Sequence, residues 1–208
     1  MATKPVIVGR SSSHFTRVAR LFAAELGVDC DLRVVRDLMS SDAADYGGNP
    51  ALKMPTLVTA RGTFFGALPV CRELARQSSS SPRIVWPEDL DTPLLSNAQE
   101  LSLHIMATGV SLTLSKVSGV PEHNAHRIKM QQSLRESLSW LETNVVEVRQ
   151  ALPVDRDFSF LEVALFCAIT HFKFRDVVPT DSYFALNAFC EEFAQRPSAR
   201  GTEYRFDP

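Results

Sequence analysis

The sequence predicts a two-domain α+β chain in which a domain of mixed strands and helices, residues 1–77, precedes an all-α domain, residues 94–208. Short β-branched runs alternate with helical patterns in the first part, whereas almost every segment of the last part has helical periodicity. Residues 78–93 contain four consecutive serines and three prolines, which is typical of a linker. A chain of 208 residues is long enough for two domains.

The first domain begins with a βαβ unit. Pro5–Gly9 is apolar, β-branched and closed by a glycine, which predicts a buried strand. Apolar residues recur at steps of three and four between Phe15 and Leu26, and Gly27 ends this predicted helix. Leu32–Val35 is a second β-branched run. A strand, a helix and a strand in about 30 residues place the two strands parallel in one sheet.

A hairpin and a further helix complete the first domain. Ser40–Asn49 is polar and suits an irregular helix or loop. Thr56–Thr59 and Thr63–Phe65 flank an Arg-Gly turn, and this pattern predicts two antiparallel strands. Leu68–Gln77 has helical periodicity, with Pro69 tolerated in its first turn. The order βαβ, loop, ββα is that of a thioredoxin-like domain.

The second domain is expected to consist of helices alone. Ser159 and Glu162 form a capping box, which marks a helix start, and Pro197 closes the last helical pattern. The helical patterns are Leu94–Lys116, Glu122–Gln150, Val163–Phe174 and Tyr183–Gln195.

Composition and charge exclude several classes of protein. Hydrophobic residues make up 45% and charged residues 22%, as in ordinary soluble domains. The formal net charge of -2 argues against a nucleic-acid partner. We expect no membrane partner, because no window holds the roughly 18 apolar residues of a spanning helix. The start of the chain also lacks the pattern of a signal peptide. Four scattered cysteines without a CxxC pair indicate reduced thiols, no metal and a cytoplasmic protein.

The loop before the third strand resembles that of the cytosolic glutathione transferase superfamily. It reads Asn49-Pro50-Ala51-Leu52-Lys53-Met54-Pro55-Thr56-Leu57, and in that family Asn-Pro, a Lys and then a Pro lead into the strand. The resemblance covers nearly the whole chain. Its other matching residues are Ser159–Glu162, Phe189, Phe193, Arg196-Pro197-Ser198 and Thr202.

The resemblance implies a protein that binds glutathione as co-substrate on the thioredoxin-like domain. It also implies addition of the glutathione sulfur to a hydrophobic electrophile lodged against the helical domain, and a homodimer. Pro55 corresponds to the family's cis-proline, which lets Met54 present its backbone N–H and C=O to an extended peptide. Lys53 suits the glycyl carboxylate of glutathione, or is a solvated loop charge.

Ser11–Arg17 resembles the Ser-Pro-Phe-x-Arg segment of serine-type, bacterial-like members, with Ser13 on the serine. A thiol with a pKa near 8.5 is mostly protonated at pH 7, so the reaction needs a group that stabilises the thiolate. A hydroxyl donor and a helix N-terminus both do so. Ser13 is the first candidate, and Ser11 or Ser12 the second. A serine before a helix is also what an N-cap requires.

The family pattern breaks at the start of the second helix, where an acidic residue and a Ser normally hold the γ-glutamyl amine and carboxylate. Gly66 and Ala67 stand there instead. The backbone N–H of Ala67 or Leu68 is still able to meet a carboxylate at a helix N-terminus. The ammonium loses its counter-charge, unless a second chain of a dimer supplies one. Two lost charged hydrogen bonds weaken affinity by one to several orders of magnitude.

Two functions from different classes follow. The first is a serine-type glutathione transferase, which Ser13, Lys53 and Pro55 favour. The second is a non-catalytic module of the same fold that binds a hydrophobic ligand or a protein partner, which Gly66 and Ala67 favour. Thiol–disulfide exchange is not expected, because it needs a Cys where Ser13 stands.

Overall fold

The computed structural model describes residues 4–208, so residues 1–3 of the predicted first domain lie outside the described residues. The chain divides into two compact units. Unit 1 contains the residues up to Pro82 together with Ala194–Pro208, and unit 2 contains Arg83–Phe193. This division differs from the sequence boundaries, which assigned the closing segment to the helical domain.

Unit 1 is built on a four-stranded mixed sheet in the order β2-β1-β3-β4. Strand β1 (Val6–Gly9) pairs in parallel with β2 (Asp31–Val34) and antiparallel with β3 (Thr56–Thr59). Strand β4 (Gly62–Phe65) continues from β3 as an antiparallel hairpin. The parallel pair and the hairpin predicted from the sequence are therefore confirmed, with bounds that differ by one residue at most.

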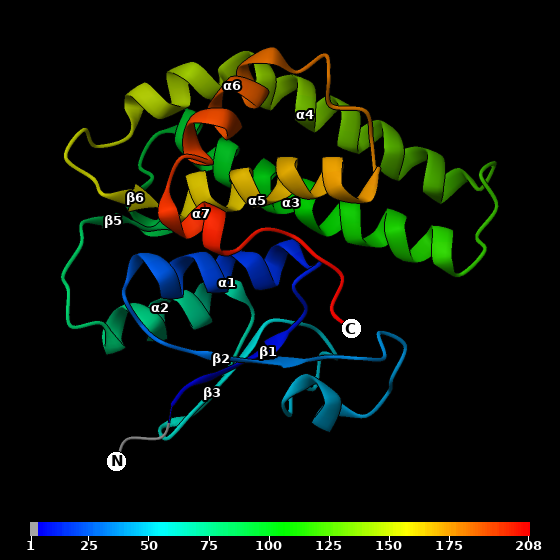
Figure 1. The fold of residues 1–208 in the computed structure, drawn as a ribbon. Helices are drawn as coiled ribbons and strands as arrows, with labels where there is room; N and C mark the ends of the chain where they lie inside the picture. Colours follow the sequence, from blue (N-terminus) through cyan, green and yellow to red (C-terminus); the bar gives the residue numbers. More distant parts are fainter. Residues whose placement is uncertain (1–3) are drawn as a thin grey trace. The chain divides into compact units, whose positions relative to one another are not determined.

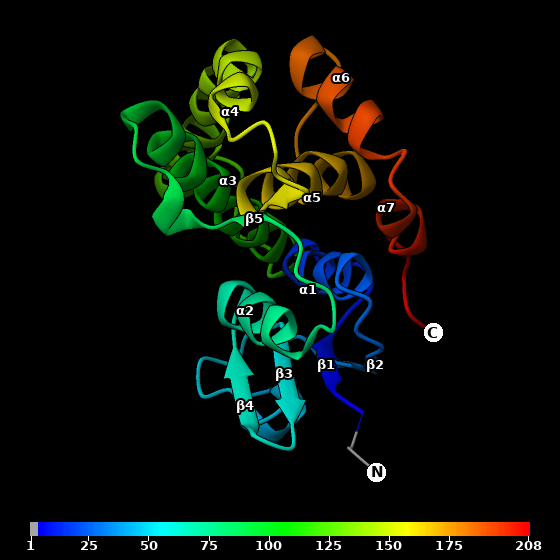
Figure 2. The same ribbon diagram turned by 90° about the vertical axis from the view of Figure 1, so that its left-hand side faces the viewer.

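Two helices cover one face of this sheet, α1 (His14–Glu25) and α2 (Ala67–Gln77), and they lie side by side in both views (Figures 1 and 2). A short 3₁₀ helix, η1 (Ala43–Tyr46), lies in the stretch predicted as an irregular helix or loop. The core of unit 1 is apolar and fully buried. Its members include Ile7, Val18, Leu21, Phe22, Leu57, Val70 and Leu74.

The closing segment is bonded to α1. Its short helix α7 (Pro197–Gly201) follows Arg196, whose guanidinium donates two hydrogen bonds of 2.6 and 2.9 Å to Glu25. The Ser198 hydroxyl donates to the same carboxylate. The guanidinium of Arg17 stacks on the Tyr204 ring at 4.3 Å. These contacts explain why the segment groups with unit 1.

Unit 2 consists mainly of four helices, and each overlaps a helix predicted from the sequence. They are α3 (Pro93–Val117), α4 (Ala125–Ala151), α5 (Phe160–Arg175) and α6 (Phe184–Phe193). The predicted linker contains a 3₁₀ helix, η2 (Pro87–Asp89), and strand β5 (Ile84–Val85), which pairs in parallel with β6 (Phe158–Ser159). Two-residue strands are too short to carry an alternating pattern, so the sequence did not predict this pair.

Helix α5 forms the core of unit 2. All of its residues from Phe160 to Ile169 are buried, and the Phe166 ring stacks on Phe193 of α6 at 4.6 Å. Gly109 of α3 allows Phe172 of α5 to approach closely, because a Cβ at that glycine would lie 2.6 Å from the ring. The phenylalanines of this region therefore serve helix packing.

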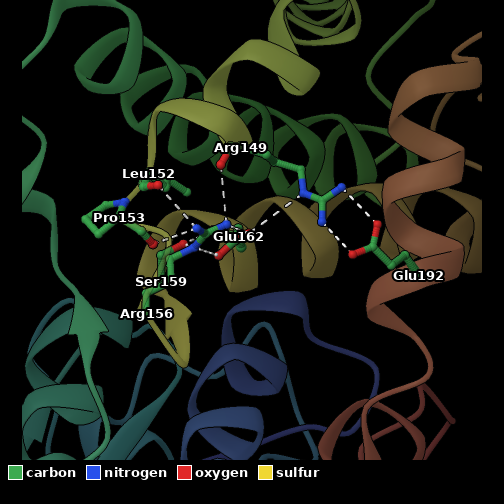
Figure 3. A network of polar contacts seen from close by, with 7 residues as sticks. All are labelled: Arg149, Leu152, Pro153, Arg156, Ser159, Glu162 and Glu192. Carbon is green, nitrogen blue, oxygen red and sulfur yellow. Dashed lines mark hydrogen bonds and ion pairs between the residues drawn. The ribbon is translucent and has the colours of Figure 1, made fainter.

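A polar network fixes the start of α5 (Figure 3). The Ser159 hydroxyl accepts the Glu162 N–H at 3.0 Å and donates to the Glu162 carboxylate at 2.8 Å, which confirms the helix start predicted from the capping box. The Arg156 guanidinium adds two hydrogen bonds of 2.9 and 2.7 Å to that carboxylate. Arg149 of α4 binds Glu192 of α6 through two more, and this pairing lowers the pKa of Glu192. The network therefore links α4, α5 and α6.

A second buried carboxylate fixes the β3–β4 hairpin to α2. The Glu73 side chain is 3% exposed and accepts hydrogen bonds from Arg61 (3.1 Å), Arg76 (2.8 and 2.6 Å) and Gln77 (2.8 Å). The bonds from Arg76 contribute most to lowering the pKa of Glu73, which falls from 4.5 to about 2. Ionised Glu73 therefore stabilises unit 1.

This pKa shift predicts a pH-dependent loss of stability. Because the pKa of Glu73 is depressed on folding, its contribution is complete above about pH 4.5 and is lost as the pH falls towards about 2. We expect the free energy of unfolding to fall across this window by up to about 3 kcal/mol more in the wild type than in Glu73→Gln. Urea unfolding at a series of pH values measures this, with exposed Glu203→Gln as control. Parallel curves for the wild type and Glu73→Gln would contradict the prediction.

Candidate functional site

The topology of unit 1 brings three segments together at one end of the sheet. Val8 of β1 lies opposite Thr56, the first residue of β3, so the chain that leaves β1 passes beside the chain that enters β3. Thr56 in turn pairs with Phe65, the last residue of β4. The Gly66 N–H continues this pairing by donating to the Pro55 C=O at 2.9 Å.

The three segments are Ser11–Ser13, Lys53–Pro55 and Gly66–Leu68. They contain every site residue predicted from the sequence: Ser13, Lys53, Met54, Pro55 and Ala67. Every residue of the candidate site therefore belongs to unit 1.

Ser13 is the N-cap of α1. Its hydroxyl oxygen accepts the Thr16 N–H at 3.3 Å, and its backbone is extended. Within residues 4–208 the hydroxyl hydrogen of Ser13 has no acceptor. The cap uses only a lone pair of the oxygen, so the same hydroxyl is still able to donate to an anion. Capping and stabilisation of a thiolate are thus compatible roles.

The three serines of this segment differ in exposure. Ser11 is 1% and Ser12 5% exposed, whereas Ser13 is half-buried and reachable from solvent. The Ser11 N–H donates to the Asp207 carboxylate at 2.7 Å, and this bond attaches the serine segment to the closing residues of unit 1. This order of exposure favours Ser13 as the group that meets a ligand.

The loop before β3 is held by Asn49. Its side-chain amide donates to the Lys53 C=O at 2.8 Å, and its amide oxygen accepts the Ala51 N–H at 3.0 Å. The Met54-Pro55 bond is cis, as expected from the resemblance. In the part of the chain that the structure describes, neither the Met54 N–H and C=O nor the Lys53 ammonium has a hydrogen-bond partner.

Helix α2 begins without a side-chain cap. Its N-cap residue Gly66 has φ +83° and ψ 161°, a conformation that essentially requires glycine. The Val70 N–H bonds to the Gly66 C=O, and Pro69 has no N–H. Among the described residues, the Ala67 and Leu68 N–H groups of this turn are left without acceptors. An acidic residue at position 66 would be strained, which is a backbone reason for the break in the family pattern.

Cys71, the cysteine nearest this site in sequence, is fully buried on α2, so its thiol is not accessible to reagents. None of the four cysteines forms a disulfide within residues 4–208. Burial is the main cause that raises the pKa of Cys30 to about 11. In that same range no three His, Cys, Asp or Glu side chains are grouped to hold a metal ion. The helices described there include none that is long and apolar enough to span a membrane.

No protein-family model matches the chain, and no curated protein does. Solved structures match along almost its whole length. A glutathione transferase family member from Pseudomonas fluorescens Pf-5, solved with bound glutathione, has a TM-score of 0.78 at 22% identity. The match covers 97% of this chain and 99% of that chain. The chain has the glutathione transferase fold.

Other proteins with the glutathione transferase fold are similar over the same extent. A glutathione S-transferase from Methylobacillus flagellatus KT, also solved with bound glutathione, has a TM-score of 0.74 at 17% identity and covers 97% of this chain and 100% of its own. A Tau class glutathione S-transferase from mango, Mangifera indica, has a TM-score of 0.71 at 16% identity, and the match covers 99% of this chain and 94% of that chain. The predicted fold class, a thioredoxin-like domain followed by an all-α domain, is confirmed.

Proposed function

We propose that the chain is a member of the glutathione transferase superfamily that binds glutathione at the candidate site of unit 1. We further propose that it transfers the glutathione thiolate to a hydrophobic electrophile, as a cytoplasmic homodimer of the serine type. The observation that carries the proposal is the set of unpaired polar groups on the three segments at one end of the sheet. Similar folds solved with bound glutathione support it.

Each unpaired group matches a part of an extended γ-glutamyl tripeptide. The Met54 N–H and C=O pair with the backbone of its cysteine, as in an added β-strand. The Lys53 ammonium binds the glycyl carboxylate. The Ala67 and Leu68 N–H groups bind the γ-glutamyl carboxylate at the N-terminus of α2.

Ser13 then supplies the chemistry. Its unpaired hydroxyl hydrogen donates to the glutathione sulfur, and the N-terminus of α1 favours negative charge there. Both effects lower the pKa of the bound thiol and raise the fraction of thiolate at neutral pH. The thiolate forms the new carbon–sulfur bond as a leaving group departs, or as the electrophile's double bond takes up a proton.

An exposed apolar stripe on α3 supports the homodimer. Val110, Leu114 and Val117 recur at steps of four and three, and all three are exposed. Apolar stripes of this kind are typical of association surfaces. A second copy of the chain is the partner we propose for it.

The alternative function is a non-catalytic module that binds a hydrophobic ligand or a protein partner. The observation that favours it is Gly66, which offers no side chain to an ammonium and has a backbone conformation that disfavours adding one. Glutathione binding therefore decides between the two.

Calorimetric titration with glutathione tests the proposal. We expect the wild type to bind in the micromolar to low-millimolar range, and Ala67→Ser to bind about tenfold more tightly, because the added hydroxyl donates to the carboxylate. Ala75→Ser, near the other end of α2, is the matched control and should bind like the wild type. Binding by Ala67→Ser alone would indicate a glutathione site that has been lost. Absence of binding in all three proteins would favour the non-catalytic module.

A further inference from the structure

Arg10 directly follows β1, and its guanidinium has no anionic partner among residues 4–208. Its Nε is buried, and within residues 4–208 its side chain has no hydrogen-bond or ion-pair partner. Arg127 and Arg149 also have a buried, unbonded Nε, but their terminal nitrogens bind the Val120 C=O and the Glu192 carboxylate. A charge partly withdrawn from water is costly unless it is paired. The missing acceptor of Arg10 therefore points to a ligand.

The strand register places Arg10 beside the candidate site. Continuing the antiparallel pairing of Val8 with Thr56 puts Arg10 opposite Met54, and the bond from the Val35 N–H to the Gly9 C=O shows that pairing with β2 extends to the end of β1. The observed pairing ends at Val8 and Thr56, and β1 ends at Gly9, so this register continued by two residues places Arg10 next to the backbone that we propose to bind the peptide.

The alternation of side chains indicates the face on which Arg10 lies. A Cβ on Gly9 would meet the Thr16 side chain of α1, so α1 covers the Gly9 face of the strand. Val8 lies on the other face, in a cluster with Tyr46 against which Met54 packs. Arg10 follows the end of β1 by one residue, and continued alternation predicts that it shares the face of Val8. Arg10 and the Lys53-Met54 segment are therefore expected on the same side of the sheet.

We propose that Arg10 and Lys53 together bind the carboxylate at the C-terminal end of a peptide-like thiol. This inference rests on the proposed function, because it takes the ligand to lie along Met54. A guanidinium suits the task, since its planar fork donates two parallel hydrogen bonds to one carboxylate. Arg10 and the three site segments include two cations and no Asp or Glu. The carboxylate beside them, Asp207, accepts the Ser11 N–H at 2.7 Å. The site therefore selects an anionic thiol mainly by the carboxylates of that thiol.

Titration of three ligands into three proteins tests this inference. The ligands are glutathione, its glycyl ethyl ester and N-acetylglutathione, and the proteins are the wild type, Arg10→Gln and Arg33→Gln. Arg33 is the matched control, because it lies on neighbouring β2 and already donates to the Ala44 C=O at 3.3 Å. We expect Arg10→Gln to weaken the binding of glutathione by at least about tenfold and the binding of the ester by less than about twofold. Arg33→Gln should change neither.

The wild type should bind N-acetylglutathione within about threefold of glutathione, because none of the three site segments offers a carboxylate to the ammonium. The free energy of unfolding of Arg10→Gln should equal or exceed that of the wild type, since an unpaired charge is removed. A lower stability would assign Arg10 to the fold instead.

If Arg10→Gln loses the same affinity for glutathione and for its ester, or loses none, the role of Arg10 would be overturned while glutathione binding itself would stand. A wild-type affinity for N-acetylglutathione more than about tenfold below that for glutathione would overturn the selection by carboxylates. Failure of the wild type to bind any of the three ligands would instead remove the proposed function, and this inference with it.

Discussion

Replacing Ser13 by alanine is expected to lower the rate of glutathione conjugation by roughly ten- to a hundredfold. The hydroxyl donates to the thiolate, and a hydrogen bond to a charged group contributes about 1.5 to 3 kcal/mol. The same substitution removes the cap on the Thr16 N–H, which costs about 1 kcal/mol of stability. Measuring kcat/KM together with the free energy of unfolding separates the two effects.

The control for Ser13→Ala is a substitution that removes a helix cap outside the candidate site. Thr92 caps α3 through the Leu95 N–H at 3.2 Å, so Thr92→Ala should lose similar stability and keep its conjugation rate. Ser13→Thr retains a hydroxyl and should keep most of the activity. A Ser13→Ala rate equal to that of Thr92→Ala would reduce Ser13 to a helix cap and exclude the serine mechanism.

Replacing Glu162 by alanine is expected to destabilise unit 2 by about 3 to 5 kcal/mol. The Glu162 side chain is only 8% exposed, and that of Arg156 only 15%. The substitution leaves the Arg156 guanidinium buried without its carboxylate and the Ser159 hydroxyl without its acceptor (Figure 3). Urea unfolding monitored by circular dichroism measures the loss.

The neighbouring pair of Arg149 and Glu192 provides the control. The Glu192 side chain is 67% exposed, so Glu192→Ala should cost less than about 1 kcal/mol. Removing both buried partners, in Glu162→Leu with Arg156→Met, should recover part of the stability lost in Glu162→Ala. Equal losses for Glu162→Ala and Glu192→Ala would show that burial of the network contributes nothing.

Local patterns in the sequence predict most of this fold. The strands of unit 1, its helices α1 and α2 and the four helices of unit 2 follow from β-branched runs, periodicity and turn residues, which act over a few neighbouring positions. The pairing of β5 with β6, the attachment of the closing segment and its helix α7, which begins at Pro197 where the sequence predicted a helix end, do not. The bonds between Glu25 and Arg196 join residues 171 positions apart, and no local pattern encodes such a contact.

The candidate site was predictable in its residue types and not in its bonding. The Asn-Pro, Lys and Pro pattern indicated Lys53, Met54 and Pro55, which the structure brings together with Ser13. The resemblance ranked Ser13 ahead of Ser11 and Ser12, but the sequence did not show that these two neighbours are buried. Nor did it indicate Arg10, whose importance lies in the absence of any acceptor among residues 4–208.

The most direct test of the account is the ionisation of bound glutathione. Ultraviolet difference titration of the glutathione complex follows the thiolate as the pH rises. The account predicts that the thiol of bound glutathione ionises about one pH unit or more below the ordinary thiol pKa of about 8.5, and that Ser13→Ala abolishes most of this shift. A bound thiol that ionises at the same pH as free glutathione would contradict the proposed transferase.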